Sequence, residues 1–214
     1  ALLRELGLVD LRTRGTFVVT PQVYRLAAAA KGWRDLEMAA RPTLRRLSDM
    51  TTETAFLMRR SDDEAIFVAS AEPERALALS FRVGSASVLH RGAVAKVLLA
   101  FSSSRFQSTY IARHIDEPAQ GEQLALEMKR IRKAGHAEST AEVDDGIWGG
   151  AVPVLLDRDL VASVSIAGPE SRIGSTGRRK IIGYLEAGAE EIARQLSRGP
   201  WGTGGQSHDL KGAG

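Results

Sequence analysis

The sequence predicts an α+β protein in which amphipathic helices alternate with short strands of an antiparallel sheet. Two stretches, 33–50 and 179–196, place apolar residues at the three- and four-residue steps of a helix with one buried face. Two runs of strand length, 53–59 and 65–71, flank turn-forming residues and predict an antiparallel pair. The 214 residues, of which 43% are hydrophobic, suffice for one main domain with a small appendage.

The composition excludes several kinds of chemistry. The chain contains no cysteine and four histidines, which excludes disulfides, thiolate zinc sites and iron–sulfur clusters, so we expect no metal and no cofactor. Because the chain has neither an apolar run of about 18 residues nor a secretory signal, we expect a cytoplasmic protein without a membrane partner. The net charge of +3 permits contact with nucleic acid but does not require it.

Residues 1–20 have the pattern of the second half of a winged helix. Residues 1–7 are typical of the last turns of a helix that ends at Gly7, and two β-prone runs, 8–11 and 16–19, flank a short turn. This order of a helix and a hairpin with a basic tip matches the end of that fold. We expect its first half to lie upstream of the first residue.

Four side chains of this segment are candidates for contact with DNA: Arg4 on the helix, and Arg12, Thr13 and Arg14 at the hairpin tip. Cationic and hydroxyl side chains at such a tip can reach phosphates or the minor groove. Arg12 and Arg14 are two residues apart, which places both on one side of an extended strand. The alternative is a solvated turn that happens to be basic.

The rest of the chain divides into a linker, a main domain and a tail. Thr20 followed by Pro21 is typical of a helix start and predicts a linker helix over 21–32. The main domain covers 33–197 and begins with a long helix whose apolar face packs in the core or against a second chain. Residues 198–214 are rich in glycine and lack a periodic apolar face, so we expect a flexible tail.

Inside the main domain we expect two groups of strands separated by helices. A third strand follows the first pair, and a hairpin turning at 157–159 precedes the closing helix. The predicted bounds are 53–59, 65–71 and 75–81 for the first strands, 92–101 and 124–133 for the helices, and 147–156 and 160–167 for the hairpin. Between the two helices, the stretch to Gly121 has the pattern of a helix and then a loop.

Four groups of motifs follow one another in a recognisable order. They are ELGLV at 5–9 with GTFVVT at 15–20, VLH at 88–90 with AKVLLA at 95–100, IRKAGH at 131–136, and GAVPV at 150–154 with SVSIAGP at 163–169. Their order and spacing closely resemble the IclR family of bacterial regulators, over residues 1 to about 196.

The resemblance implies a fold and a set of partners. The expected fold is a winged helix, a linker helix that helps to dimerise, and a GAF-like domain with a curved antiparallel sheet flanked by helices. The expected partners are double-stranded operator DNA, a small organic acid as effector, and further copies of the chain in a dimer or a dimer of dimers.

The start of the predicted helix at 92–101 is a candidate anion site. The first N–H groups of a helix lack acceptors, its dipole favours negative charge there, and Gly92 lets a ligand approach the chain closely. From the residues alone, the alternative is an ordinary solvent-exposed helix start. The resemblance implies that an effector carboxylate binds main-chain groups at Ala93 and Val94.

Four further positions match those that hold the effector in the family: Ser139, Gly149, Ser165 and Ala167. Relatives that bind glyoxylate or pyruvate have polar side chains there, whereas here only the two serines do. A tiny acid would lack partners in such a pocket, so we expect an acid with an apolar or aromatic body, with Ser165 as a second donor. The alternative is that Ser165 points outward from its strand, and Trp148 either stacks on the ligand or lies in the core.

Two other groups of residues are interpreted as structural. His90 and His136 have no serine or aspartate in a local arrangement typical of a catalytic triad. An acidic cluster lacks the interval of a calcium loop and its terminal glutamate, so we interpret it as a solvated acidic turn. It consists of Glu138, Glu142, Asp144 and Asp145.

The sequence therefore predicts an allosteric regulator and not an enzyme. In this interpretation an organic acid changes the spacing or orientation of two winged helices. A small-molecule enzyme and a sensor module without DNA binding are the alternatives. A convergent acid, base and nucleophile would favour the enzyme, and an intact helix-turn-helix upstream would favour the regulator.

Overall fold

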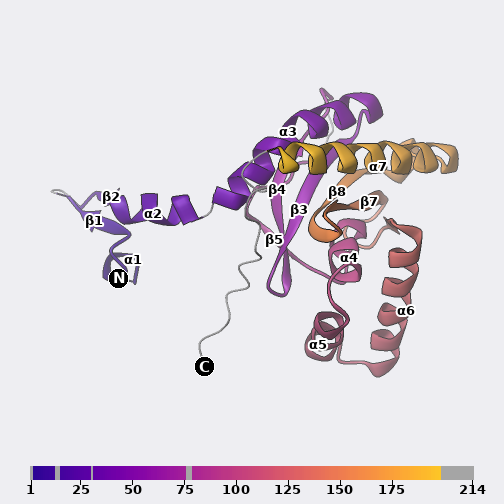
Figure 1. Cartoon of the computed structure of the whole chain (residues 1–214), viewed down its shortest axis with the longest axis horizontal. Coiled ribbons are helices and arrows are strands. Elements are labelled where there is room, and N and C mark those ends of the chain that lie inside the picture. The colour runs from indigo at the N-terminus through magenta and orange to yellow at the C-terminus, as the bar shows by residue number, and fades with distance from the viewer. Residues whose placement is uncertain (1, 13–14, 30, 76–78, 199–214) are drawn as a thin grey trace. The chain divides into compact units, whose positions relative to one another are not determined.

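The computed structural model describes residues 2–12, 15–29, 31–75 and 79–198 (Figure 1). The chain divides into two units, Ala1–Leu36 and Glu37–Gly214. Thr13, Arg14 and the predicted tail beyond residue 198 lie outside the described residues.

The N-terminal unit contains a short helix, a hairpin and a second helix. These elements are α1 (Leu2–Glu5), β1 (Val9–Leu11), β2 (Phe17–Val19) and α2 (Pro21–Ala29). Val9 pairs with Val19 across the hairpin, and Thr20 caps α2 because its hydroxyl accepts the Gln22 N–H at 3.3 Å. The predicted order of these elements is confirmed, whereas their assignment to a winged helix stays a prediction.

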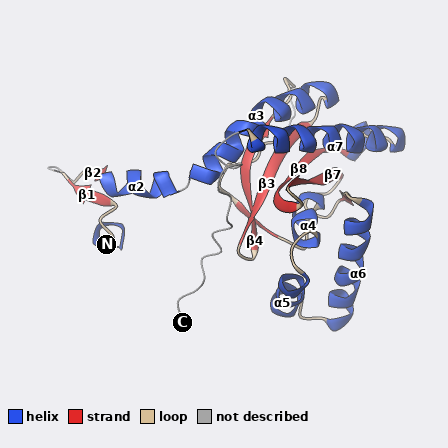
Figure 2. Cartoon of the chain, viewed as in Figure 1, coloured by secondary structure: helices blue, strands red, loops and turns tan. Residues whose placement is uncertain are grey.

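A six-stranded antiparallel sheet forms the centre of the second unit (Figure 2). Its strand order is β5-β4-β3-β8-β7-β6. Shifts of register at Leu57/Met58 and Val154/Leu155 bend the strands. The strands are β3 (Thr54–Ser61), β4 (Glu64–Ala71), β5 (Ala86–Val88), β6 (Ala137–Thr140), β7 (Ile147–Leu156) and β8 (Asp159–Pro169). The predicted α+β fold with a curved antiparallel sheet is confirmed.

Helices cover both faces of the sheet (Figure 1). The α7 face is covered by α7 (Ser175–Ser197), which packs on α3 (Lys31–Thr51). The α4 face is covered by α4 (Ala93–Ala100), which in turn packs on α6 (Pro118–Ala134). α5 (Ser104–His114) packs on α6.

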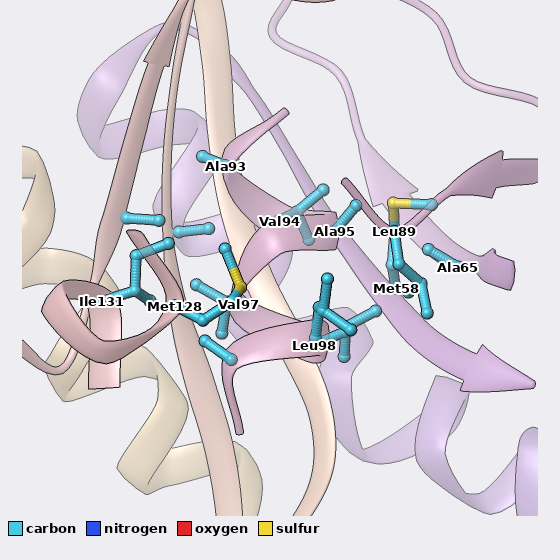
Figure 3. Packing of buried hydrophobic residues seen from close by; sticks show 14 of the residues in the cluster. Met58, Ala65, Leu89, Ala93, Val94, Ala95, Val97, Leu98, Met128 and Ile131 are labelled. Carbon is cyan, nitrogen blue, oxygen red and sulfur yellow. The ribbon is translucent and has the colours of Figure 1, made fainter. Parts of the chain in front are cut away.

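A cluster of buried apolar side chains lies on the α4 face. It joins Met58 of β3, Leu98 of α4 and Met128 of α6 (Figure 3). Every residue of α4 is buried, as expected for a helix that is apolar at every position except Lys96. α4 therefore has a fixed position, and its first residue lies over the strands.

Of the predicted strand at 75–81, residue 75 and residues 79–81 form no strand, and residues 76–78 lie outside the described residues. The described apolar residues of this stretch, Leu79 and Phe81, pack against the core. The Phe81 ring lies 4.5 Å from that of Phe56 and 4.7 Å from that of Phe67. The Leu79 carbonyl accepts the Thr54 hydroxyl at 2.8 Å. β5 forms this edge of the sheet instead, and neither β5 nor β6 was predicted because both are very short.

The predicted loop before the second helix is also wrong. α6 begins at Pro118, so Gly121 lies inside it. Proline is favoured in the first turn because its missing N–H has no acceptor there. Glycine at position 121 lets α6 pack closely on α5, because a Cβ at this position would lie 3.0 Å from the Ile111 side chain of α5. The predicted hairpin of β7 and β8 is confirmed, and Asp157 and Arg158 turn it with positive φ angles of 52° and 74°.

Candidate effector site

Strand register gathers four of the predicted effector residues on the α4 face. Ser139 pairs with Gly149, and Gly149 pairs with Ala167 on its other side. Residues directly opposite one another share a face, and so does Ser165, two positions before Ala167. A Cβ at Gly149 would lie 3.4 Å from the Ser139 Oγ and 4.0 Å from the Ala93 Cβ. The small residues of the sheet thus lie directly beneath the start of α4.

The start of α4 presents main-chain donors to this row. Gly92, the N-cap, has a φ of 80°, which favours glycine. The Ala93 N–H donates to the Ser139 Oγ at 3.0 Å, and the Gly92 N–H donates to the Glu142 Oε2 at 3.0 Å. The N–H of Val94 is in the first turn, where no intrahelical acceptor exists. Oxygen atoms of the protein itself therefore contact two of the donors at the predicted carboxylate position.

A buried cation completes the site. Lys96, one turn into α4, is 3% exposed in its side chain. Its Nζ lies 2.6 Å from the Glu127 Oε1 of α6 and 2.6 Å from the Glu142 Oε1. The sequence analysis did not single out Lys96, although a lone charge inside an apolar helix is expected to be paired.

The loop between β6 and β7 carries Glu142 to this position. Ala141 and Gly146, at its ends, have positive φ angles of 54° and 70°. The Arg91 Nε donates to the Glu142 carbonyl at 3.0 Å, while the Glu142 carboxylate accepts from Gly92 and Lys96. The interpretation of Glu142 as part of a solvated acidic turn is therefore wrong, because its partners are on α4, far away in sequence.

Trp148 does not lie with the other predicted effector residues. Adjacent residues of a strand point to opposite faces, so Gly149 faces α4 and Trp148 faces α7. The Trp148 Nε1 donates to the Glu138 Oε2 at 3.0 Å, and the Arg178 guanidinium of α7 lies 5.8 Å from the ring centroid. The ring is fully buried. Trp148 is a core residue of the α7 face, and its prediction as an effector contact is corrected.

Ser165 faces α4, but its hydroxyl proton is already used. The Oγ donates to the Gly150 carbonyl at 2.8 Å, and the residue is buried. A serine has a single O–H donor, so in this arrangement Ser165 offers lone pairs and no proton to a ligand. In this structure Ser165 therefore cannot act as the predicted second donor to a carboxylate.

His90 belongs to a network beside the entrance to α4. The Tyr110 hydroxyl accepts the Leu89 N–H at 2.9 Å and lies 2.8 Å from the His90 Nδ1. Burial lowers the pKa of His90 and raises the pKa of Tyr110. The His114 Nε2 lies 2.9 Å from the Asp63 Oδ2, and this bond lowers the pKa of Asp63. The network holds the chain at Leu89 and His90, just before α4 begins.

The described residues add two further findings about partners. No three His, Asp or Glu side chains among them lie close enough together to hold a metal ion. None of the helices in the described ranges combines the length and apolar character that crossing a membrane requires.

The α7 face contains a cavity that the sequence did not predict. Its volume is about 280 Å³, and its polar lining includes Glu53, Arg75, Arg172 and Lys180. Arg172 donates to both carboxylate oxygens of Glu53, at 2.7 and 2.6 Å. Three separate segments line this cavity, so no single motif indicates it.

The DNA candidates are placed only in part. Arg4 lies on α1 and is exposed. Arg12 directly follows β1, and its main-chain N–H donates to the Thr16 carbonyl at 2.8 Å, which closes the hairpin. Their contact with DNA stays a prediction.

Sequence similarity connects this domain with a known family. Residues 29–194 match the family described as bacterial transcriptional regulator IclR, C-terminal. The chain belongs to the IclR family. The family predicted from the four groups of motifs is thus confirmed.

Among IclR-family proteins, the chain is similar to two curated transcriptional regulators. It is 26% identical over 188 residues to KdgR of Dickeya chrysanthemi and 29% identical over 191 residues to BhcR of Paracoccus denitrificans. The alignments cover 84% of this chain and 61% of KdgR, and 85% of this chain and 66% of BhcR. The chain thus spans less than two thirds of either regulator.

A solved structure has the same IclR fold. An IclR homologue from Microbacterium hydrocarbonoxydans, in complex with 4-hydroxybenzoate, superposes with a TM-score of 0.76 at 17% identity. The superposition covers 92% of this chain and 83% of that chain. At this identity the likeness concerns the fold alone.

Proposed function

We propose that this chain is part of a DNA-binding transcription regulator whose domain at 33–197 binds a small organic acid and thereby alters operator binding. The observation that carries the proposal is the convergence of helix N–H donors, Ser139 and Lys96 above a row of small residues on the α4 face. Preorganised N–H groups and a cation are the chemistry that recognises a carboxylate. The naming of the relatives as transcriptional regulators supports the regulatory role.

The acid has an apolar, preferably aromatic, body. Gly149 and Ala167 offer no hydrogen-bonding side chains, so polar substituents placed over them would lose hydrogen bonds to water without replacement. The homologue that was crystallised with 4-hydroxybenzoate makes this acid a suitable probe.

The N-terminal unit supplies the DNA contact and the coupling. In a dimer, the winged helices of two copies read two half-sites, and the acid changes their relative positions through the linker helix. The free energy of such coupling is typically about 1–3 kcal/mol, which is enough for regulation without catalysis. The regulation takes place in the cytoplasm. Light scattering of the chain should give at least a dimer. Replacing Arg12 and Arg14 with alanine should flatten the salt dependence of DNA binding.

Calorimetry with three compounds tests the ligand class. 4-Hydroxybenzoate should bind, 4-hydroxybenzamide should bind much more weakly because it lacks the charge, and pyruvate should bind more weakly because it lacks the apolar body. Equal binding of the acid and the amide, or tighter binding of pyruvate, would contradict the proposal.

A further inference from the structure

The charges around Lys96 do not leave room for another anion. One buried ammonium group already has two carboxylates at 2.6 Å, those of Glu127 and Glu142. A third carboxylate at the start of α4 would add a like charge beside two existing ones, and the cation that they share is 3% exposed, so solvent screens this repulsion only in part. An acid therefore binds here only if one of the two resident carboxylates leaves.

The two carboxylates differ in how freely they can leave. Glu127 lies in the middle of α6, whose position is fixed by the buried residues Leu124, Met128 and Ile131. Glu142 lies in the loop at 141–146, where Val143 is 59% exposed and Asp144 and Asp145 are exposed. Within the loop, Glu142 is held by polar bonds from α4 and from Arg91. Main-chain bonds hold the two ends of the loop: the Ala141 N–H donates to the Ile147 carbonyl at 2.9 Å, and the Gly146 carbonyl accepts the Glu170 N–H at 2.8 Å. Glu142 is the group that can move away while the fold persists.

From this arrangement we infer that Glu142 is a tethered carboxylate that occupies the acid position, and that a ligand acid binds by displacing it. The inference rests on the proposed function and adds the event that binding triggers. The Glu142 carboxylate bonds the Gly92 N–H and the Lys96 Nζ, which are donors that a free acid would use. After displacement, Lys96 keeps its bond to Glu127 and donates to the ligand with one of its other two N–H groups. The loop at 141–146 then changes position whenever an acid is bound.

The competition predicts an unusual mutational effect, because removing a polar contact of the site should tighten binding. If the loop is open about a tenth of the time in the natural protein, removal of Glu142 raises the apparent affinity roughly ten-fold. Glu142→Gln keeps the size of the side chain and an oxygen for the Gly92 N–H, but it loses the charge. Glu142→Ala removes both. Glu127→Gln is the matched control, since it removes the same charge from the same cation on the side that does not contact Gly92.

Calorimetry with 4-hydroxybenzoate should be carried out on the natural chain and on all three variants. Binding that is about ten-fold tighter in both Glu142 variants, with no gain in Glu127→Gln, would support the displacement, as would binding seen only in the Glu142 variants. Equal or weaker binding in the Glu142 variants would overturn it while leaving the proposed function intact. An equal gain in Glu127→Gln would also overturn it, because the loss of general charge repulsion would then explain the tighter binding. If none of the four proteins binds the acid, the proposed function fails as well.

Hydrogen exchange gives a second readout that does not depend on affinity. Saturating acid should speed exchange of the amides at 141–146 in the natural chain, whereas in Glu142→Ala the exchange should already be fast and should not change. Slower exchange of this loop in the natural chain on addition of acid would overturn the displacement.

Discussion

The two faces of the sheet use the same strands in different ways, and β7 shows the contrast most clearly. Towards α4 it places Gly149 and Ala151, and towards α7 it places Trp148 and Val152. The small residues lie beneath the polar start of α4, whereas the large ones fill the space beneath α7. Alternation along one strand thus separates the proposed binding surface from a stabilising core.

The ion pairs of the two faces also differ, because one is a closed pair and the other is a cation shared by two carboxylates. On the α7 face, Arg172 and Glu53 make two bonds to each other, and Glu53 is 5% exposed. On the α4 face, Lys96 is shared by two carboxylates, one of which belongs to a surface loop. A bidentate pair is a fixed support, whereas a shared cation allows an exchange of partners.

Among substitutions that affect only one face of the sheet, the largest effect is expected at Trp148. Trp148→Ala should lower the free energy of unfolding by about 3–5 kcal/mol, because it opens a cavity under α7. Urea unfolding measures this loss, with Trp148→Phe as a milder control that keeps much of the apolar volume. Acid binding by the fraction that remains folded should be nearly unchanged. A stable variant with weakened binding would place Trp148 in the effector site after all.

A matched pair of glycine substitutions tests the two faces at adjacent positions. Gly150→Ala should destabilise the protein by about 1–3 kcal/mol, because the new Cβ would lie 2.5 Å from the Trp148 ring and 3.1 Å from Ile182. Gly149→Ala should leave stability within about 0.5 kcal/mol of the natural chain, because its Cβ makes ordinary contacts, but should weaken acid binding. Thermal unfolding and calorimetry on both variants measure these effects. The comparison between the faces fails if the two variants behave alike.

The smallest effect is a pH dependence near the entrance to α4. The pKa of His90 is lowered in the folded state by burial, so the unfolded chain takes up a proton first as the pH falls below about 6.5. Stability should decline from that pH down to the folded pKa of His90, by less than about 1.4 kcal/mol for each unit of pKa difference. Urea unfolding between pH 7 and pH 5 measures the slope, and His90→Gln should flatten it.

Asp63 provides a control in a different pH window. Its pKa is lowered in the folded state by the bond from His114, so its contribution is present above its ordinary pKa of about 3.9 and is lost below it. Asp63→Asn should therefore leave most of the slope between pH 7 and pH 5 that His90 produces. A complete loss of that slope in Asp63→Asn would contradict its assignment to His90.

Much of the fold follows from periodicity, and the exceptions have identifiable causes. The helices α3 and α7 and the β7–β8 hairpin repeat their patterns over many residues and are predicted well. β5 and β6 contain 3 and 4 residues, too few to show a period, and both depend on pairing with a longer neighbour. The loop that carries Phe81 has an apolar pattern because it packs into the core.

The candidate site was predicted only where a local pattern or the family resemblance pointed to it. The grouping of Ser139, Gly149 and Ala167 followed from the resemblance. Lys96 and Glu142 were missed as partners because they are 46 residues apart, and only the fold brings their charges together. The face of Trp148 was available from the sequence, because neighbours on a strand cannot both point into one pocket.

Amide NMR shifts during titration with 4-hydroxybenzoate directly test the claim that the acid binds at the start of α4. If the acid binds at the start of α4, the largest shifts will occur at Gly92, Ala93 and Val94 and in the loop at 141–146, and 4-hydroxybenzamide will not reproduce them. Largest shifts around the cavity of the α7 face, lined by Arg172 and others, would contradict the claim.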